Sequence, residues 1–228
     1  MGLVYAMAIF MSWLAILLLA TRLEIGQVGF GVVVAFVFLK AFLNTGLFIV
    51  AHDSMHNTLS PGCPFVNKSV GAVALLLYAG LDFSSCKRKH LLHHKSPESS
   101  IDPDYRPYAK ANYLNWFVSF LGSYLSGQSL FLLFFGWVAL CSLSKSSYES
   151  VMVFNVLPLV LSSLQLFTFG VWMPHRPGGE NDAPTPRSSN LPPLIALIAC
   201  YNFGYHHEHH ENPFIPWYVL PRFAMMKP

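Results

Sequence analysis

The chain of 228 residues is 54% hydrophobic and 15% aromatic, and only 11% of its residues are charged. Soluble domains carry roughly 25% charged residues, so this sequence has too few charges to cover a surface that faces water. The formal charge of +3 includes no lysine- or arginine-rich block, which argues against nucleic acid as a partner. The four cysteines form no CxxC pair, which argues against a disulfide framework. We expect one integral-membrane domain covering residues 1–228.

The first two apolar runs predict two transmembrane helices. They cover residues 2–20 and residues 26–51, and each provides the roughly 20 residues that a bilayer core requires. Residues 21–26 between them allow only a tight hairpin. The first residues carry neither the basic flank of a secretory signal nor a myristoylation site, so no processing or lipidation is expected.

The next two apolar regions are less regular. Residues 67–81 are too short for a full crossing, which indicates an interfacial or re-entrant helix. Residues 113–143 are too long for one untilted span, and polar residues at 123–128 divide them into an interfacial helix and a third span near 129–143. The expected fold is therefore all-α, with about four transmembrane helices plus interfacial helices.

A fourth span is expected over residues 149–172, and the Pro-, Gly-, Ser- and Asn-rich residues 174–193 indicate a loop. Four spans place segments 52–112 and 173–228 on one side of the membrane. These segments hold eleven of the fourteen basic residues. Because basic residues accumulate on the cytoplasmic side, we expect this side, with all ten histidines on it or at its boundary, to face the cytoplasm.

The histidines are grouped in three boxes with the sequences HDSMH, HLLHH and HHEHH. Residues three and four apart share one face of a helix, with Cβ atoms roughly 5–6 Å apart. Each box can therefore direct two or three imidazoles at one point. The candidate metal ligands in the boxes are His52, His56, His90, His93, His94, His206, His209 and His210.

The number of these histidines favours two metal ions. Imidazole binds iron, zinc, copper and nickel, and one octahedral metal with an open position needs only about five ligands. A single HxxxH is more often an ordinary core or surface pair, and an HHEHH tract alone can bind metal adventitiously. However, each buried imidazole without a partner costs about 1–3 kcal/mol, which makes three boxes on one side of the membrane costly without metal.

Longer stretches around the boxes resemble a known family. They are GLFIVAHDSMH over 46–56, His93-His94 through Asp102-Pro103-Asp104-Tyr105, PHRP over 174–177, and CYNFGYHHEHH over 200–210 followed by NPFIPWYVLP. The boxes resemble those of the membrane fatty-acid desaturase and hydroxylase superfamily, and the flanks resemble the bacterial and cyanobacterial β-carotene ketolases. Members of that family usually have a longer polar segment before the first span.

The resemblance implies a di-iron enzyme that uses O2 and two external electrons per turn. It hydroxylates the allylic C4 of a β-ionone ring twice, and the geminal diol loses water, so that β-carotene gives echinenone and then canthaxanthin. The substrate then needs an apolar tunnel that opens into the bilayer. Candidate lining residues, for which ordinary helix packing is the plainer interpretation, are Phe48, Phe83, Trp116, Tyr124, Phe167, Trp172 and Phe203.

The electrons require a separate carrier, because the sequence has no flavin, haem or nucleotide motif. An acidic ferredoxin is a candidate, and the basic run Lys87-Arg88-Lys89 is a possible docking site. The positive-inside bias explains the same residues equally well.

Several further residues are candidates for the site. His175 is a possible ninth ligand, whereas His207 points about 100° away from His206 on a helix and is expected outside the ligand set. Carboxylates commonly accept hydrogen bonds from ligating imidazoles. Asp53, Asp102 and Asp104 are therefore the catalytic candidates, with Glu208 as a fourth acceptor, although Asp102 and Asp104 equally suit a loop-capping role.

Other functions remain open at this stage. A carotene hydroxylase or a fatty-acid desaturase shares the boxes and differs in the substrate tunnel. A membrane metal carrier belongs to another class, but it should hold its ligands near the midplane of the bilayer. Lys40 and Asn44 are polar residues within a span, which suggests a functional site, but snorkelling or a hydrogen bond inside the bundle is the plainer account.

Overall fold

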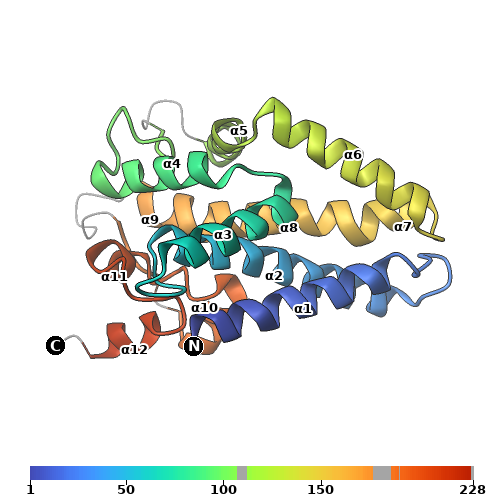
Figure 1. The fold of residues 1–228 in the computed structure, drawn as a ribbon, viewed down its shortest axis with the longest axis horizontal. Helices are drawn as coiled ribbons and strands as arrows, with labels where there is room; N and C mark the ends of the chain where they lie inside the picture. The colour runs from blue at the N-terminus through green and yellow to red at the C-terminus, as the bar shows by residue number, and fades with distance from the viewer. Residues whose placement is uncertain (107–111, 177–185, 190, 227–228) are drawn as a thin grey trace.

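A computed structural model describes residues 1–106, 112–176, 186–189 and 191–226. The regular structure of these residues is entirely helical, which confirms the predicted all-α class. Among them, α1 (Gly2–Ala20), α2 (Phe30–Met55) and the continuous stretch Tyr148–His175 are each long and apolar enough to cross a membrane. Figure 1 shows these three lying alongside one another.

Helix α2 is the centre of the bundle and contacts α1, α3 and α8. It begins at Phe30 rather than at residue 26 because residues Glu24 to Gln27 form a turn, closed by the Gln27 N–H to Glu24 carbonyl bond of 2.9 Å. It continues past residue 51, since the polar residues that follow are buried against other elements. His52 therefore lies on the last turn of a long helix.

Close backbone approach fixes one side of α2. A Cβ atom at Gly46 would lie 2.5 Å from the hydroxyl oxygen of Tyr201 and 3.0 Å from Ile9. Tyr201 stacks on Phe42, with ring centroids 4.3 Å apart. Glycine at this position lets the segment before the third histidine box pack directly on α2.

Two pairs of helices are sharply bent. α3 (Pro64–Ala79) and α4 (Phe83–Lys95) meet at 99°, and α5 (Tyr113–Tyr124) and α6 (Gly127–Leu143) meet at 92°. Gly80 makes the first turn possible with a φ of +64°. The described residues contain three single-helix spans, or up to five if each bent pair crosses once. The predicted count of about four lies within this range.

The stretch Tyr148–His175 contains two wide turns. It consists of α7 (Tyr148–Val151), the π-helix η2 (Met152–Val156), α8 (Leu157–Phe167), the π-helix η3 (Thr168–Trp172) and α9 (Met173–His175). Residues 174 and 175 were expected in a loop, and that prediction was wrong, because the helix continues from the π-helix η3 through Pro174 to His175. The other described residues of the predicted loop are non-helical up to Pro192, and α10 begins at Pro193, the last residue of the predicted loop. Residues 177–185 and 190 lie outside the described residues.

Three short helices complete the chain: α10 (Pro193–Cys200), α11 (His206–Glu211) and α12 (Leu220–Met225). The ends of α2, α4 and α9 lie near α11 and α12 at one end of the bundle (Figure 1). The α1–α2 and α6–α7 connections lie at the opposite end. The three histidine boxes therefore meet at one end of the molecule.

Candidate metal centre

Nine of the ten histidines form two groups. In each group the ring nitrogens lie within 4.8 Å of one another. The first group consists of His52, His56, His90, His94 and His209. The second group consists of His93, His175, His206 and His210.

Helix geometry divides the second and third boxes between the two groups. His90 and His94 are four apart on α4 and share the first group, whereas His93, one position before His94, faces the second. On α11 the pair His206 and His210 belongs to the second group and His209 to the first. Because both helices contribute to both groups, the two groups are neighbours.

The imidazoles converge through the same atom, Nε2. In the first group the Nε2 of His209 lies 3.1 Å from that of His52 and 3.0 Å from that of His94. In the second group the Nε2 of His210 lies 3.1 Å from those of His93 and His206. Metal–nitrogen bonds of about 2.1 Å place neighbouring ligands of an octahedral ion about 3.0 Å apart. The spacing fits ligands around a metal ion.

Hydrogen bonding alone does not satisfy this arrangement. Each Nε2 has one site in the plane of its ring, occupied either by a proton or by a lone pair. The Nε2 of His206 nevertheless faces both His175, at 3.0 Å, and His210, at 3.1 Å. A single proton or lone pair on Nε2 cannot form good hydrogen bonds to two neighbouring rings. A cation, in contrast, accepts a lone pair from every ring. The donor set therefore suits a metal ion in each group.

Carboxylates orient two of these rings through their other nitrogen. The Nδ1 of His93 lies 2.9 and 3.0 Å from the two carboxylate oxygens of Asp102, and that of His175 lies 3.2 Å from Glu98. An N–H donated from Nδ1 leaves the Nε2 lone pair directed at the metal position. Sequence reasoning missed Glu98, which lies 77 positions from His175 and has no motif around it.

Burial keeps the α11 imidazoles neutral. Desolvation, followed by the charges of neighbouring histidines, lowers the pKa of His206 and of His209 well below its usual value, and lowers that of His210 in the same way. Neutral imidazole is the form that ligates metal. These rings are therefore ready to bind metal at neutral pH.

The three catalytic candidates have different surroundings. Burial alone would raise the pKa of Asp102, but the hydrogen bond and charge of His93 lower it overall. Burial raises the pKa of Asp104 to about 6, and its Oδ2 lies 4.0 Å from Nδ1 of His93. The Asp53 carboxylate lies 3.6 Å from Nδ1 of His52 and belongs to neither histidine group.

His207 and Glu208 point away from both groups. The half-exposed side chain of His207 interacts with the Pro186 carbonyl at 3.1 Å and with Glu211 at 3.2 Å. Glu208 accepts a hydrogen bond from Ser188. The structure thus separates His207 from the other histidines of its box, in line with the helix-based expectation.

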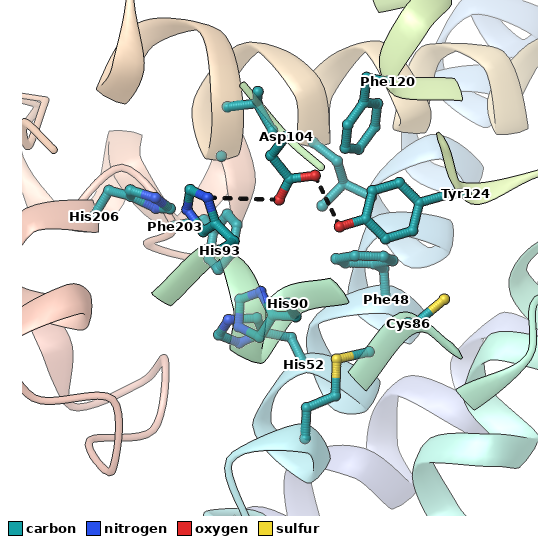
Figure 2. A pocket seen from close by; sticks show the side chains of 14 residues that line it. Phe48, His52, Cys86, His90, His93, Asp104, Phe120, Tyr124, Phe203 and His206 are labelled. Atoms are coloured by element: carbon teal, nitrogen blue, oxygen red, sulfur yellow. Dashed lines mark hydrogen bonds and ion pairs between the residues drawn. The ribbon is translucent and has the colours of Figure 1, made fainter. Parts of the chain in front are cut away.

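A small, mainly apolar cavity of about 40 Å³ lies beside the two groups. Figure 2 shows four histidines at one side and aromatic rings at the other. The histidines come from both groups: His52, His90, His93 and His206.

Three of the seven predicted lining residues border this cavity: Phe48, Tyr124 and Phe203. Trp116, Phe167 and Trp172 instead pack together in a neighbouring hydrophobic cluster, and Phe83 packs in the main core. For these four residues, ordinary packing is the better description.

The polar residues within the second span face another helix. Lys40 is only 2% exposed, and its ammonium group lies 4.5 Å from the ring centre of Trp13 on α1. Asn44 accepts a hydrogen bond of 2.8 Å from the indole N–H of Trp13. The pair therefore belongs to the α1–α2 contact and does not border the cavity.

Comparisons with known proteins agree with this site. The sequence model of the fatty acid desaturase family matches residues 28–143 and 125–228. Two proteins named beta-carotene ketolase, from Paracoccus sp. strain PC1 and strain N81106 / MBIC 01143, are 37% and 38% identical to the chain, and each alignment covers 79% of this chain and 74% of the relative. A zeaxanthin 4-ketolase of Chlamydomonas reinhardtii is 34% identical over 88% of this chain and 46% of its own length.

No solved structure matches the chain. The family match covers more than half of the chain, and the two Paracoccus relatives are aligned over more than two thirds of both sequences. The long apolar helices agree with an integral membrane protein. The chain therefore belongs to the β-carotene ketolases of the fatty acid desaturase family and is an oxygenase.

Proposed function

We propose that the protein is a di-iron, O2-dependent carotenoid ketolase. It oxidises C4 of the β-ionone ring, converting β-carotene to echinenone and then to canthaxanthin. The main support is the position of the apolar cavity against histidines of both groups. An apolar substrate that enters this cavity has a ring carbon close to the metal positions.

We propose that the two histidine groups each hold one iron ion. His52, His56, His90, His94 and His209 hold one ion, and His93, His175, His206 and His210 hold the other. Iron supplies the redox chemistry that activates O2, which zinc lacks.

The proposed reaction balances when each turn takes up one O2, two protons and two electrons from the reduced carrier. In the first turn one C4–H bond breaks and a C–OH bond forms, with one oxygen atom of O2 entering the substrate and the other leaving as water. This turn consumes two electrons and two protons. A second, identical turn at the same carbon gives a geminal diol, which loses water to leave the ketone.

The side chains of this protein bind and orient the substrate in this scheme. Phe48, Phe120 and Phe203 give the cavity an apolar wall that suits a polyene. Asp102 and Glu98 hold the His93 and His175 rings in place through Nδ1. We assign Asp53 a similar but weaker positioning role beside His52, at 3.6 Å.

We further propose that the single domain, residues 1–228, crosses the membrane four times. In this topology α3 and α4 form a re-entrant pair and the histidine end faces the cytoplasm. The basic residues at that end support this orientation. A reduced acidic ferredoxin then docks near Lys87 and Arg88, because the ammonium group of Lys89 is already occupied with the Ser123 carbonyl and the Tyr124 ring.

Product analysis separates this function from its alternatives. The chain is expressed in a bacterium that makes β-carotene, and the pigments are analysed by mass spectrometry. A ketolase gives products with one oxygen gained and two hydrogens lost per ring. A hydroxylase gives products with one oxygen gained and no hydrogen lost, and a metal carrier leaves β-carotene unchanged. Either of these last results overturns the proposal.

A further inference from the structure

Asp104 and Tyr124 form a hydrogen-bonded pair on the wall of the cavity (Figure 2). The hydroxyl of Tyr124 donates to Oδ1 of Asp104 at 2.8 Å. These are the only oxygen-bearing side chains among the described residues that line the cavity. A carotene hydrocarbon has no polar atom with which such a pair could interact. The oxygen atoms of the pair therefore make no hydrogen bond to the unoxidised substrate.

Asp104 is held in place by its neighbours. Its backbone N–H donates to Oδ1 of Asp102 at 2.9 Å, and its carbonyl accepts the indole N–H of Trp116 at 2.7 Å. Its Oδ2 lies 4.0 Å from Nδ1 of His93, beyond hydrogen-bonding distance, because that nitrogen is directed at Asp102. The carboxylate is thus fixed between a histidine of the second group and Tyr124.

The pair retains hydrogen-bonding capacity toward the cavity. A phenol oxygen has two lone pairs in addition to the proton that Tyr124 donates to Asp104, and each carboxylate oxygen has two. Figure 2 shows the Asp104 carboxylate between the His93 ring and Tyr124, above the ring of Phe48. A hydroxyl group that enters this space meets acceptors on one side and metal-facing histidines on the other.

We propose that Asp104 and Tyr124 bind the hydroxyl group of the singly oxidised intermediate and hold its carbon in place for the second oxidation. This inference rests on the proposed ketolase function. The bound alcohol donates its O–H to the pair, and the pair itself forms and breaks no covalent bond. The second turn uses O2 and two electrons from the reduced carrier, as the first does.

Retention of the alcohol determines the products. An intermediate that leaves the cavity after one turn accumulates as a hydroxylated carotenoid, whereas one that stays becomes the ketone. Loss of one hydrogen bond in an apolar cavity weakens retention by about three- to tenfold. The ratio of alcohol to ketone therefore reports on the pair, whatever the total turnover.

The test compares Tyr124→Phe with Tyr113→Phe. Both variants lose one phenol hydroxyl, but that of Tyr113 bonds Thr168 at 2.7 Å, and Tyr113 does not line the cavity. The pigments of each variant are analysed in the β-carotene-producing bacterium. We expect the alcohol-to-ketone ratio to rise about three- to tenfold in Tyr124→Phe and to equal the wild-type ratio in Tyr113→Phe.

A wild-type ratio in Tyr124→Phe, with ketone still formed, overturns this inference and leaves the ketolase function intact. Absence of ketone from the wild-type protein instead overturns the proposed function. If Tyr124→Phe does not accumulate in the membrane, Asp104→Leu gives the same measurement, because it removes the acceptor oxygens at nearly the same side-chain size. A purely structural role of the pair lowers total pigment conversion in these variants and leaves the ratio unchanged, which also contradicts the inference.

Discussion

The imidazole of His93 lies between Asp102 and the second histidine group. Its Nδ1 is 2.9 Å from Oδ2 of Asp102, and its Nε2 is 3.1 Å from Nε2 of His210. Asp102 also accepts the backbone N–H groups of Glu98 and Asp104, each at 2.9 Å. One buried carboxylate thus holds the His93 ring and the loop that carries Glu98 and Asp104.

We predict that Asp102→Asn weakens metal binding about 10- to 100-fold, the usual effect of removing a hydrogen-bonded partner of a metal ligand. Iron retained against increasing concentrations of a chelator measures the change. Asp82→Asn is the matched control, because Asp82 caps α4 through the Ser85 N–H and asparagine caps equally well. Equal iron retention in the two variants contradicts the positioning role of Asp102.

Gly170→Ala is predicted to reduce carotene conversion. Gly170 lies in the π-helical turn η3 and lines the cavity, and a Cβ atom there would lie 2.5 Å from the ring of Phe203. Phe203 must then move within the cavity. Gly136→Ala, where a Cβ atom meets nothing within 4 Å, should convert carotene at the wild-type rate. Pigment analysis at equal protein levels compares the two, and unchanged conversion by Gly170→Ala argues against this cavity as the substrate site.

The two kinds of histidine in the boxes should respond differently to alanine. His94→Ala removes a member of the first group, and we expect activity to fall more than about 100-fold, beyond the effect of losing an outer partner. His207→Ala removes a half-exposed ring outside both groups and should remain close to wild type. The ketone yield in the carotene-producing bacterium measures the activity of both variants. Full activity of His94→Ala would show that the second box is not part of the metal site.

The metal-free protein should lose stability in acid. The pKa values of His206, His209 and His210 are lowered in the folded state, mainly by burial, so the folded protein binds fewer protons than the unfolded chain. The contribution of these three histidines to the free energy of unfolding is fully present above about pH 6.5, the pKa of histidine in the unfolded chain. This contribution decreases as the pH falls below that value. Two side chains act in the opposite direction. The pKa of Asp104 is raised to about 6 by burial, and that of His93, which burial alone would lower, is raised overall by the hydrogen bond to Asp102 and by nearby carboxylates.

Thermal unfolding of the metal-free protein in detergent at pH 8 and pH 5.5 tests this expectation. We predict a lower Tm at the lower pH, and the same pH dependence in His207→Ala. A Tm that is constant or rises on acidification contradicts neutral burial of the three α11 histidines.

The sequence predicted the long helices well, because nearly continuous apolar runs of bilayer length leave few alternatives. It placed the end of the second span at residue 51, since His52 and Asp53 are polar, whereas their burial continues the helix to Met55. It also placed His175 in a loop, since the pattern gives no sign that the helix continues through Pro174 to His175. Burial by distant elements is a tertiary property that local polarity does not report.

The nine histidines could be chosen from box spacing and resemblance, but their division into two groups could not. That division depends on which faces of α4 and α11 meet the histidines at the ends of α2 and α9, and the spacing within a box does not specify this. Glu98 was not recognisable as a partner of His175. Asp104 and Tyr124 were each site candidates, but their hydrogen bond to one another was not predictable, because the two residues come from separate elements. Aromatic residues were the least predictable, since packing and cavity lining use the same side chains.

The metal content of the purified protein tests the central claim most directly. Protein that converts β-carotene is purified in detergent after growth with iron, and its iron and zinc are measured per chain alongside His94→Ala and His206→Ala, one from each group. Two iron ions per wild-type chain are predicted, with reduced iron in both variants. Active protein that contains one metal ion per chain, or that contains neither iron nor zinc, would contradict the two-ion site.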